Sequence, residues 1–187
     1  MSQNVETKVI TGIARLSYAH VWTPQAISEN QEKKYSCCLL IPKTDTKTIA
    51  AINRAVEAAL QAGISKKFGG ARPRKLNTPL RCGDTDETHG GKEDYVGHYF
   101  INASSTNRPG IIDYHTRQEI IDSEKVYSGC YAIASVNFYA YNTNGNTGIA
   151  CGLNHLMKVR DGEYLGGRSR PEDDFAGVVI DDEDDYL

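Results

Sequence analysis

Residues 129–160 read GCYAIASVNFYAYNTNGNTGIACGLNHLMKVR. The part 129–141 alternates small or apolar residues with larger or polar ones, which is typical of a β-strand with one buried face. Asn144-Gly145 follows, and this dipeptide favours the tight turn of a β-hairpin because both positions tolerate positive φ. Residues 148–160 then resume an apolar pattern. The sequence therefore predicts one long β-hairpin.

The segments before the hairpin supply the other elements. Strands are expected at 13–22, 34–41, 98–103 and 110–113. Apolar residues at helical spacing predict a helix over 46–62, begun by Asp45 or Thr46 and ended at Gly63. The glycine- and proline-rich segment 64–97 predicts a long irregular connection. One helix among several strands favours a mainly β fold, an OB-fold-like five-stranded barrel (the oligonucleotide/oligosaccharide-binding fold) with a long inserted loop.

The alternation also assigns faces to the strands. In 13–22, Leu16, Tyr18, His20 and Trp22 are expected on one face and Val21 on the other, with the strand ending at Thr23-Pro24. In the hairpin strand, the residues expected inside the barrel are Cys130, Ala132, Ala134, Val136, Phe138 and Ala140. The opposite, outward face carries three tyrosines.

These tyrosines and a basic loop are the candidate binding residues. Tyr131, Tyr139 and Tyr141 can stack on nucleic-acid bases, although rings in this position can instead cover the core. Trp22 and Tyr99 are weaker candidates of the same kind. The basic residues of the loop can follow a flexible phosphate backbone without reading sequence, unless they are simply solvated. They are Lys66, Lys67, Arg72, Arg74, Lys75 and Arg81.

Charge is distributed unevenly along the 187 residues. Eight of the 24 acidic residues lie in 172–187, and all 21 lysines and arginines lie before that segment, so the body carries about +5 and the tail about −8. This balance suggests a body that binds a polyanion and a tail that interacts with cations. The expected organisation is a binding domain over 1–165 and a flexible acidic tail over 166–187. The tail residues expected to bind partner proteins are Asp181, Asp182, Glu183, Asp184, Asp185, Tyr186 and Leu187.

Several other function classes find little support. The five cysteines include no Cys-x-x-Cys pair, so they are expected to be free core thiols rather than disulfides or zinc ligands. No apolar run is long enough to span a bilayer, and the first residues lack the apolar core of a signal peptide. No catalytic residues, metal site or cofactor are predicted. A metal-dependent nuclease or recombination enzyme that uses the carboxylates of 84–94 remains an alternative.

Beyond these patterns, a series of motifs along the chain resembles, in the same order, the motifs of a known protein family. They are 15–22 (RLSYAHVW), 34–46 (KYSCCLLIPKTDT), 97–103 (GHYFINA), 108–111 (RPGI), 126–131 (VYSGCY), 137–142 (NFYAYN), 148–154 (GIACGLN) and 158–168 (KVRDGEYLGGR). Over roughly residues 8–176 the chain resembles the phage-encoded replicative single-stranded DNA-binding proteins.

The resemblance implies an oligonucleotide-binding barrel without enzymatic activity, which protects single strands during phage replication or recombination. It also implies a place in the cytoplasm of the bacterial host. The tail resembles the acidic, aromatic-ended tails of replicative single-strand binders, which compete with DNA and recruit replication partners. A homo-oligomer is possible, and a protein-interaction module of the phage is a third alternative.

Overall fold

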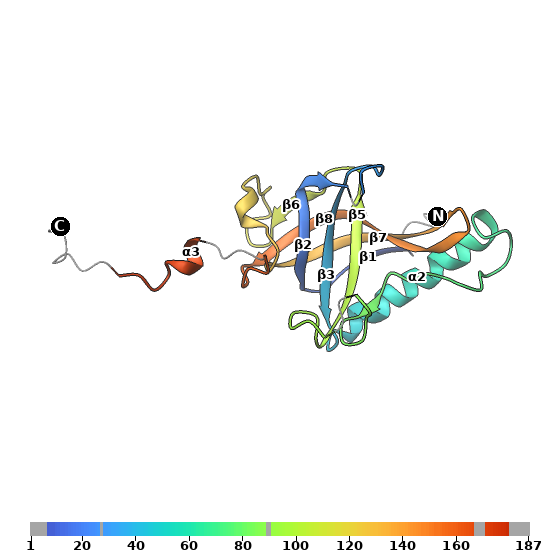
Figure 1. Cartoon of the computed structure of the whole chain (residues 1–187), viewed down its shortest axis with the longest axis horizontal. Helices are drawn as coiled ribbons and strands as arrows, with labels where there is room; N and C mark the ends of the chain where they lie inside the picture. Colours follow the sequence, from blue (N-terminus) through green and yellow to red (C-terminus); the bar gives the residue numbers. More distant parts are fainter. Residues whose placement is uncertain (1–6, 27, 89–90, 167–170, 180–187) are drawn as a thin grey trace.

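The computed structural model describes residues 7–26, 28–88, 91–166 and 171–179 (Figure 1). Its elements in chain order are β1 (Lys8–Ile10), β2 (Ala14–Gln25), β3 (Lys34–Pro42), α2 (Thr46–Lys66), β4 (Arg81–Cys82), β5 (His98–Ser105), β6 (Gly110–Asp113), η1 (Ser123–Lys125), β7 (Tyr131–Thr143), β8 (Asn146–Arg160) and α3 (Pro171–Asp174). Among the described residues, no helix combines the length and the apolar character needed to cross a membrane.

Five strands close a barrel in the order β7-β2-β3-β5-β8, because β8 also pairs with β7. All contacts in this ring are antiparallel except the parallel pairing of β5 with β8. A five-stranded barrel of this kind is the OB-fold arrangement, so the predicted fold class is confirmed. The remaining strands β1, β4 and β6 extend the sheet at its margins.

The long hairpin forms as predicted. Residues 131–143 pair with 146–160, and Asn144 and Gly145 have φ values of 51° and 82°. Positive φ at both central positions is the requirement of the tight turn that Asn-Gly favours. The inward face is also confirmed, since Ala132, Ala134 and Val136 are each fully buried.

Strand β2 departs from the predicted alternation. Tyr18 has a φ of 46°, and the pairing with β3 shifts register between Ser17 and His20. This β-bulge inserts one extra residue, so Leu16 and Val21 both point into the core although they are five positions apart. The prediction that Leu16, Tyr18, His20 and Trp22 share a face is therefore wrong. The strand also continues past Thr23-Pro24 to Gln25.

Helix α2 begins where the sequence predicts and ends one turn later. Asp45 caps it by accepting a hydrogen bond from the Thr48 amide at 3.2 Å. Gly63, expected to end the helix, lies buried inside it, against β7. A Cβ atom at Gly63 would lie 2.4 Å from the Cβ of Ala140, so the glycine lets the helix approach the strand closely. The prediction for the helix end is corrected by this packing.

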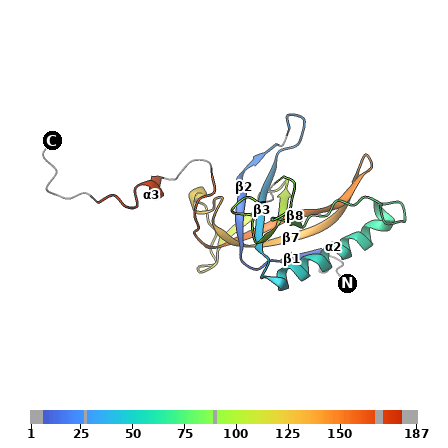
Figure 2. The same cartoon turned by 60° about the horizontal axis from the view of Figure 1, so that its bottom comes forward.

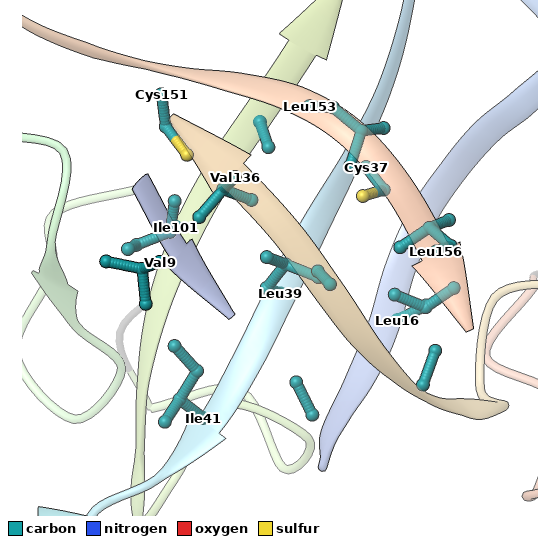
Figure 3. Packing of buried hydrophobic residues seen from close by; sticks show 14 of the residues in the cluster. Val9, Leu16, Cys37, Leu39, Ile41, Ile101, Val136, Cys151, Leu153 and Leu156 are labelled. Atoms are coloured by element: carbon teal, nitrogen blue, oxygen red, sulfur yellow. The ribbon is translucent and has the colours of Figure 1, made fainter. Parts of the chain in front are cut away.

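Two apolar cores hold the molecule together. The main core fills the barrel, where Leu39, Ile101 and Val136 point inward from β3, β5 and β7 (Figure 3). A smaller core lies on the outside of β3 and β5, where Tyr95 and Phe100 pack with Cys38 and Leu40. The two rings meet edge to face at 5.1 Å between centroids. The second core fixes part of the long 67–97 connection, which apart from the short strand β4 is irregular as predicted.

Gly63→Ala should destabilise the protein, against the usual gain from alanine in a helix. The added methyl group would clash with Ala140, and overpacking of this kind costs about 1–3 kcal/mol. The free energy of unfolding in urea measures the effect, with Ser65→Ala on the exposed side of the same turn as the control. A Gly63→Ala protein as stable as the parent would contradict the close helix–strand contact.

Candidate nucleic-acid interface

A row of small polar residues crosses the outside of four barrel strands. Ser36 on β3 pairs with Ser104 on β5, Ser104 pairs with Gly152 on β8, and Gly152 pairs with Asn137 on β7. Their chain neighbours, among them Cys37, Ala103 and Cys151, are buried in the barrel. Because side chains alternate along a strand, the row faces outward. It is called the polar row below.

A cleft lies at each end of the polar row. The first, of about 400 Å³, is lined by Gln25, Gln31, Glu32, Lys34, Ser36 and Ser104. The second, of about 270 Å³, lies between α2 and β7, and its lining includes Lys66, Lys67, Asn137 and Tyr139. Each cleft shares residues with the row, so the row links the two clefts along the outside of the barrel. The two clefts and the row between them are called the channel below.

Two hairpin arms flank this channel. The β2–β3 arm and the β7–β8 arm project from the barrel, and β5 lies between β3 of the first arm and β8 of the second (Figure 2). In OB folds, oligonucleotides bind on the face of the second and third strands and between the loops that correspond to the tips of these two arms. The channel thus lies where this fold presents its ligand surface.

The basic loop runs along the β7–β8 arm. The Asn77 backbone bridges to Gly148, the Thr147 hydroxyl donates to the Lys75 carbonyl at 2.7 Å, and the Asn142 amide donates to the Lys67 carbonyl at 3.0 Å. These bonds hold the exposed side chains of Arg72, Arg74 and Lys75 on a segment beside the arm. Lys66 and Lys67 line the second cleft, so two of the six predicted cations lie in the channel and three more lie on the loop beside the arm.

Tyr139 lies in the same cleft as Lys66 and Lys67, and 43% of its surface is exposed. Partial burial raises the pKa of its phenol, which stays neutral at physiological pH. Tyr141 differs, because its ring lies over Gly148, where a Cβ would come within 2.5 Å of the phenol oxygen. Tyr139 is thus the aromatic face available in the channel, and Tyr141 supports the arm.

The other predicted aromatic and basic residues lie elsewhere. Tyr131 is eight residues from Tyr139 along β7, roughly 26 Å away at the rise of a strand, and is flanked by the guanidinium groups of Arg160 and Arg15 at 4.3 and 5.7 Å. Trp22 packs against the core and donates to the Val126 carbonyl at 2.9 Å.

Tyr99 and Arg81 also have structural contacts. The Lys43 ammonium lies 5.1 Å from the Tyr99 ring centroid. Arg81 forms two bonds to the Asp86 carboxylate, at 2.7 and 2.9 Å, and covers the Phe100 ring. The tail residues Asp181 to Leu187 lie outside the described part of the chain.

Sequence reasoning missed the polar row itself and Lys34. Ser36, Ser104, Asn137 and Gly152 look like an ordinary solvent face when each strand is considered alone. Only the register of four strands, two of them joined in parallel, brings them into one line. Nothing local in the sequence signals that alignment.

The carboxylates of 84–94 include two that face cations. Asp84 pairs with Lys43, whose hydrogen bond lowers the pKa of that carboxyl, and Asp86 pairs with Arg81. In the described ranges, no group of three or more histidine, cysteine or acidic side chains is placed to hold a metal ion.

The described cysteines are all free thiols. Burial raises the pKa of Cys151 to about 12 and that of Cys38 to about 11. Cys82 is the exception to the predicted core placement, since it lies half-buried at the surface. Hydrogen bonds from Thr85 and, more weakly, Lys43 lower the pKa of its thiol to about 7.

Comparisons with known proteins agree with this geometry. A family model described as the ssDNA-binding protein of Enterobacter phage Enc34 matches residues 7–187. Protein p50 of Acyrthosiphon pisum secondary endosymbiont phage 1 is 30% identical over 190 residues, which cover 96% of this chain and 98% of p50.

Solved structures show the same fold. The single-stranded DNA-binding protein from bacteriophage Enc34, in complex with ssDNA, superposes with a TM-score of 0.76 at 22% identity, covering 89% of this chain and 96% of its own. The single-stranded DNA-binding protein gp2.5 of bacteriophage T7 superposes with a TM-score of 0.59 at 16% identity, covering 94% and 96%. At such identities the likeness concerns the fold.

Proposed function

Because the chain belongs to the family of the Enterobacter phage Enc34 ssDNA-binding protein, we propose that it binds single-stranded DNA in the channel between its two arms, without reading sequence. The observation that carries the proposal is the strand register that leads the polar row from one cleft to the other. The polar row joins two clefts, and cations and an exposed tyrosine gather at one end.

Each part of the channel suits a different part of a nucleotide strand. Lysines and arginines on a loop attract phosphates and fix no base identity. A tyrosine ring stacks on any base, since every base has a π-face. The short side chains of the polar row leave space above the barrel and offer hydroxyl and amide groups at several points. This combination favours binding that depends on charge and stacking rather than on sequence.

We also assign the acidic tail a regulatory role in this function. The tail carries eight carboxylates on a tether next to a body of about +5, so it competes with phosphates for the same cations. Phe175, Val178 and Val179 are exposed large apolar residues, which suit recognition by replication or recombination proteins. The setting proposed is phage replication or recombination in the cytoplasm of the host cell.

Binding to single strands should weaken steeply with salt, and the slope should report Lys66 and Lys67. Each phosphate contact contributes roughly −0.7 to the slope of log K against log salt for single strands. The double variant Lys66→Ala/Lys67→Ala should therefore reduce the slope by about 1.4. Fluorescence anisotropy on two unrelated oligonucleotides measures it.

The matched control for charge is Lys47→Ala/Arg54→Ala on the exposed side of α2, away from the channel, which should leave the slope unchanged. Salt-independent binding, binding of only one of the two oligonucleotides, or no binding at low salt would each overturn the proposed function.

Tyr139→Ala should weaken binding by about 1–3 kcal/mol, because a stacking surface is lost. The salt slope should stay constant, since no charge is removed, and Tyr139→Phe should retain the affinity. The control is Tyr131→Ala, which removes an aromatic ring of the same strand but outside the channel. Equal losses of affinity for Tyr131→Ala and Tyr139→Ala would contradict the placement of the DNA beside Tyr139.

A further inference from the structure

An apolar groove of about 470 Å³ lies on the outside of the barrel, next to the polar row. Ile133 on β7 pairs with Met157 on β8, and Met157 pairs with Ile112 on β6, so three apolar side chains cross three strands in one line. Ile10 on β1 adds a side chain that is 61% exposed. An exposed apolar surface of this kind marks a site of protein contact.

The groove borders the proposed DNA channel. Its residues Ser135 and His155 are a cross-strand pair, and the next outward pair along the hairpin is Asn137 with Gly152 of the polar row. A peptide seated in the groove therefore ends beside the channel.

The same chain carries an apolar segment without a partner among the described residues. Phe175, Val178 and Val179 are 68%, 62% and 85% exposed, and this stretch stands away from the barrel in Figure 1. Valines favour an extended conformation, which fits a narrow groove across a sheet.

The groove has a basic residue at each end, and the apolar segment has acidic residues on each side. Arg117 lies at one end, with its Nη1 atom 3.2 Å from the Met157 Sδ atom, and Lys8 lies at the other, two residues from Ile10 on the same face. Neither has an ion pair within the described ranges. The apolar segment has acidic residues on both sides, at 172–174 and 181–185.

The tether is long enough. The Leu165 amide donates to the Ser128 carbonyl at 2.9 Å, so the start of the tail is held at Ser128. Ser128 lies five residues before Ile133 along the chain. Five residues of strand span roughly 17 Å. The five steps from Gly166 to Pro171 can span about 17 Å and the helical residues of α3 add about 6 Å, so the segment can reach the groove of its own barrel.

We propose that Phe175–Val179 docks in this groove of the same molecule and so holds the acidic residues 181–185 beside the channel. The docking itself is independent of the proposed function, and only the effect on DNA rests on it. The groove provides apolar affinity, and the following carboxylates then lie near Lys8 and the cations of the second cleft. The apolar part of the tail thus acts as the anchor of its acidic part.

Methyl NMR of the full chain tests the docking directly. Val178→Asp/Val179→Asp should shift the methyl signals of Ile10, Ile112, Ile133 and Met157 relative to the parent. The signals of Ile121, which is 79% exposed outside the groove, and of Ile52 in the main core should stay unchanged. Identical spectra of parent and variant would overturn the proposal. Shifts that disappear on dilution would also overturn it, because a second copy would then supply the segment.

DNA affinity separates this inference from the proposed function. If the docked tail occupies the channel for about nine-tenths of the time, the same variant should bind single strands about tenfold more tightly at low salt. Ile133→Ser should give the same gain, and the matched Ile121→Ser none. Methyl shifts with unchanged affinity would overturn the competition. Tight DNA binding without methyl shifts would overturn the docking alone, and methyl shifts without any DNA binding would overturn the proposed function alone.

Discussion

The structure depends on the ability of β8 to pair with β7 along one edge and with β5, followed by β6, along the other. It is antiparallel to β7 along its whole length and parallel to β5 at Cys151 and Gly152. The second pairing closes the barrel and leaves no open edge between β5 and the hairpin. The inward residues at this closure, Ala103 on β5 and Cys151 on β8, are small, which leaves room for the buried ring of Phe138 on β7 beside them. A tight barrel has no room for larger side chains at all of these positions.

The same register creates the candidate site. Once β5 and β8 are aligned, Ser104 meets Gly152, and the polar row runs without interruption from β3 to β7. A slip of one residue would turn the row inward and bring core residues to the surface. The same strand register therefore closes the barrel and lines up the candidate interface. The arms and the helix add the two clefts at the ends of the row.

Whether a feature could be predicted from the sequence depends on how far apart along the chain its interacting residues lie. The hairpin and the start of α2 are set by local signals, Asn144-Gly145 and the Asp45 cap, and both are found. The bulge at Tyr18 and the buried Gly63 depend on partners far along the chain, β3 and Ala140, and both were predicted wrongly. The basic loop was recognised as a cluster by composition, but its position beside the hairpin arm comes from hydrogen bonds to the arm. Tyr131 and Tyr139 look equivalent in sequence, and the structure distinguishes them by the arginines around Tyr131 and by the cleft that holds Tyr139.

If single-stranded DNA crosses the polar row, a side chain placed at Gly152 should obstruct it. A Cβ at Gly152 would meet its neighbours at ordinary contact distances, 3.5 Å from the Asn137 carbonyl oxygen and from the Tyr139 ring, so the backbone accepts a side chain here, which projects outward over the polar row. Affinity for single strands and urea unfolding should be compared for the parent, Gly152→Leu and the control Asn53→Leu on the exposed side of α2. We expect parent-like unfolding for both variants and a loss of DNA affinity, about tenfold (roughly 1.4 kcal/mol), for Gly152→Leu alone. Parent-like affinity of a folded Gly152→Leu protein would show that single-stranded DNA does not cross the polar row.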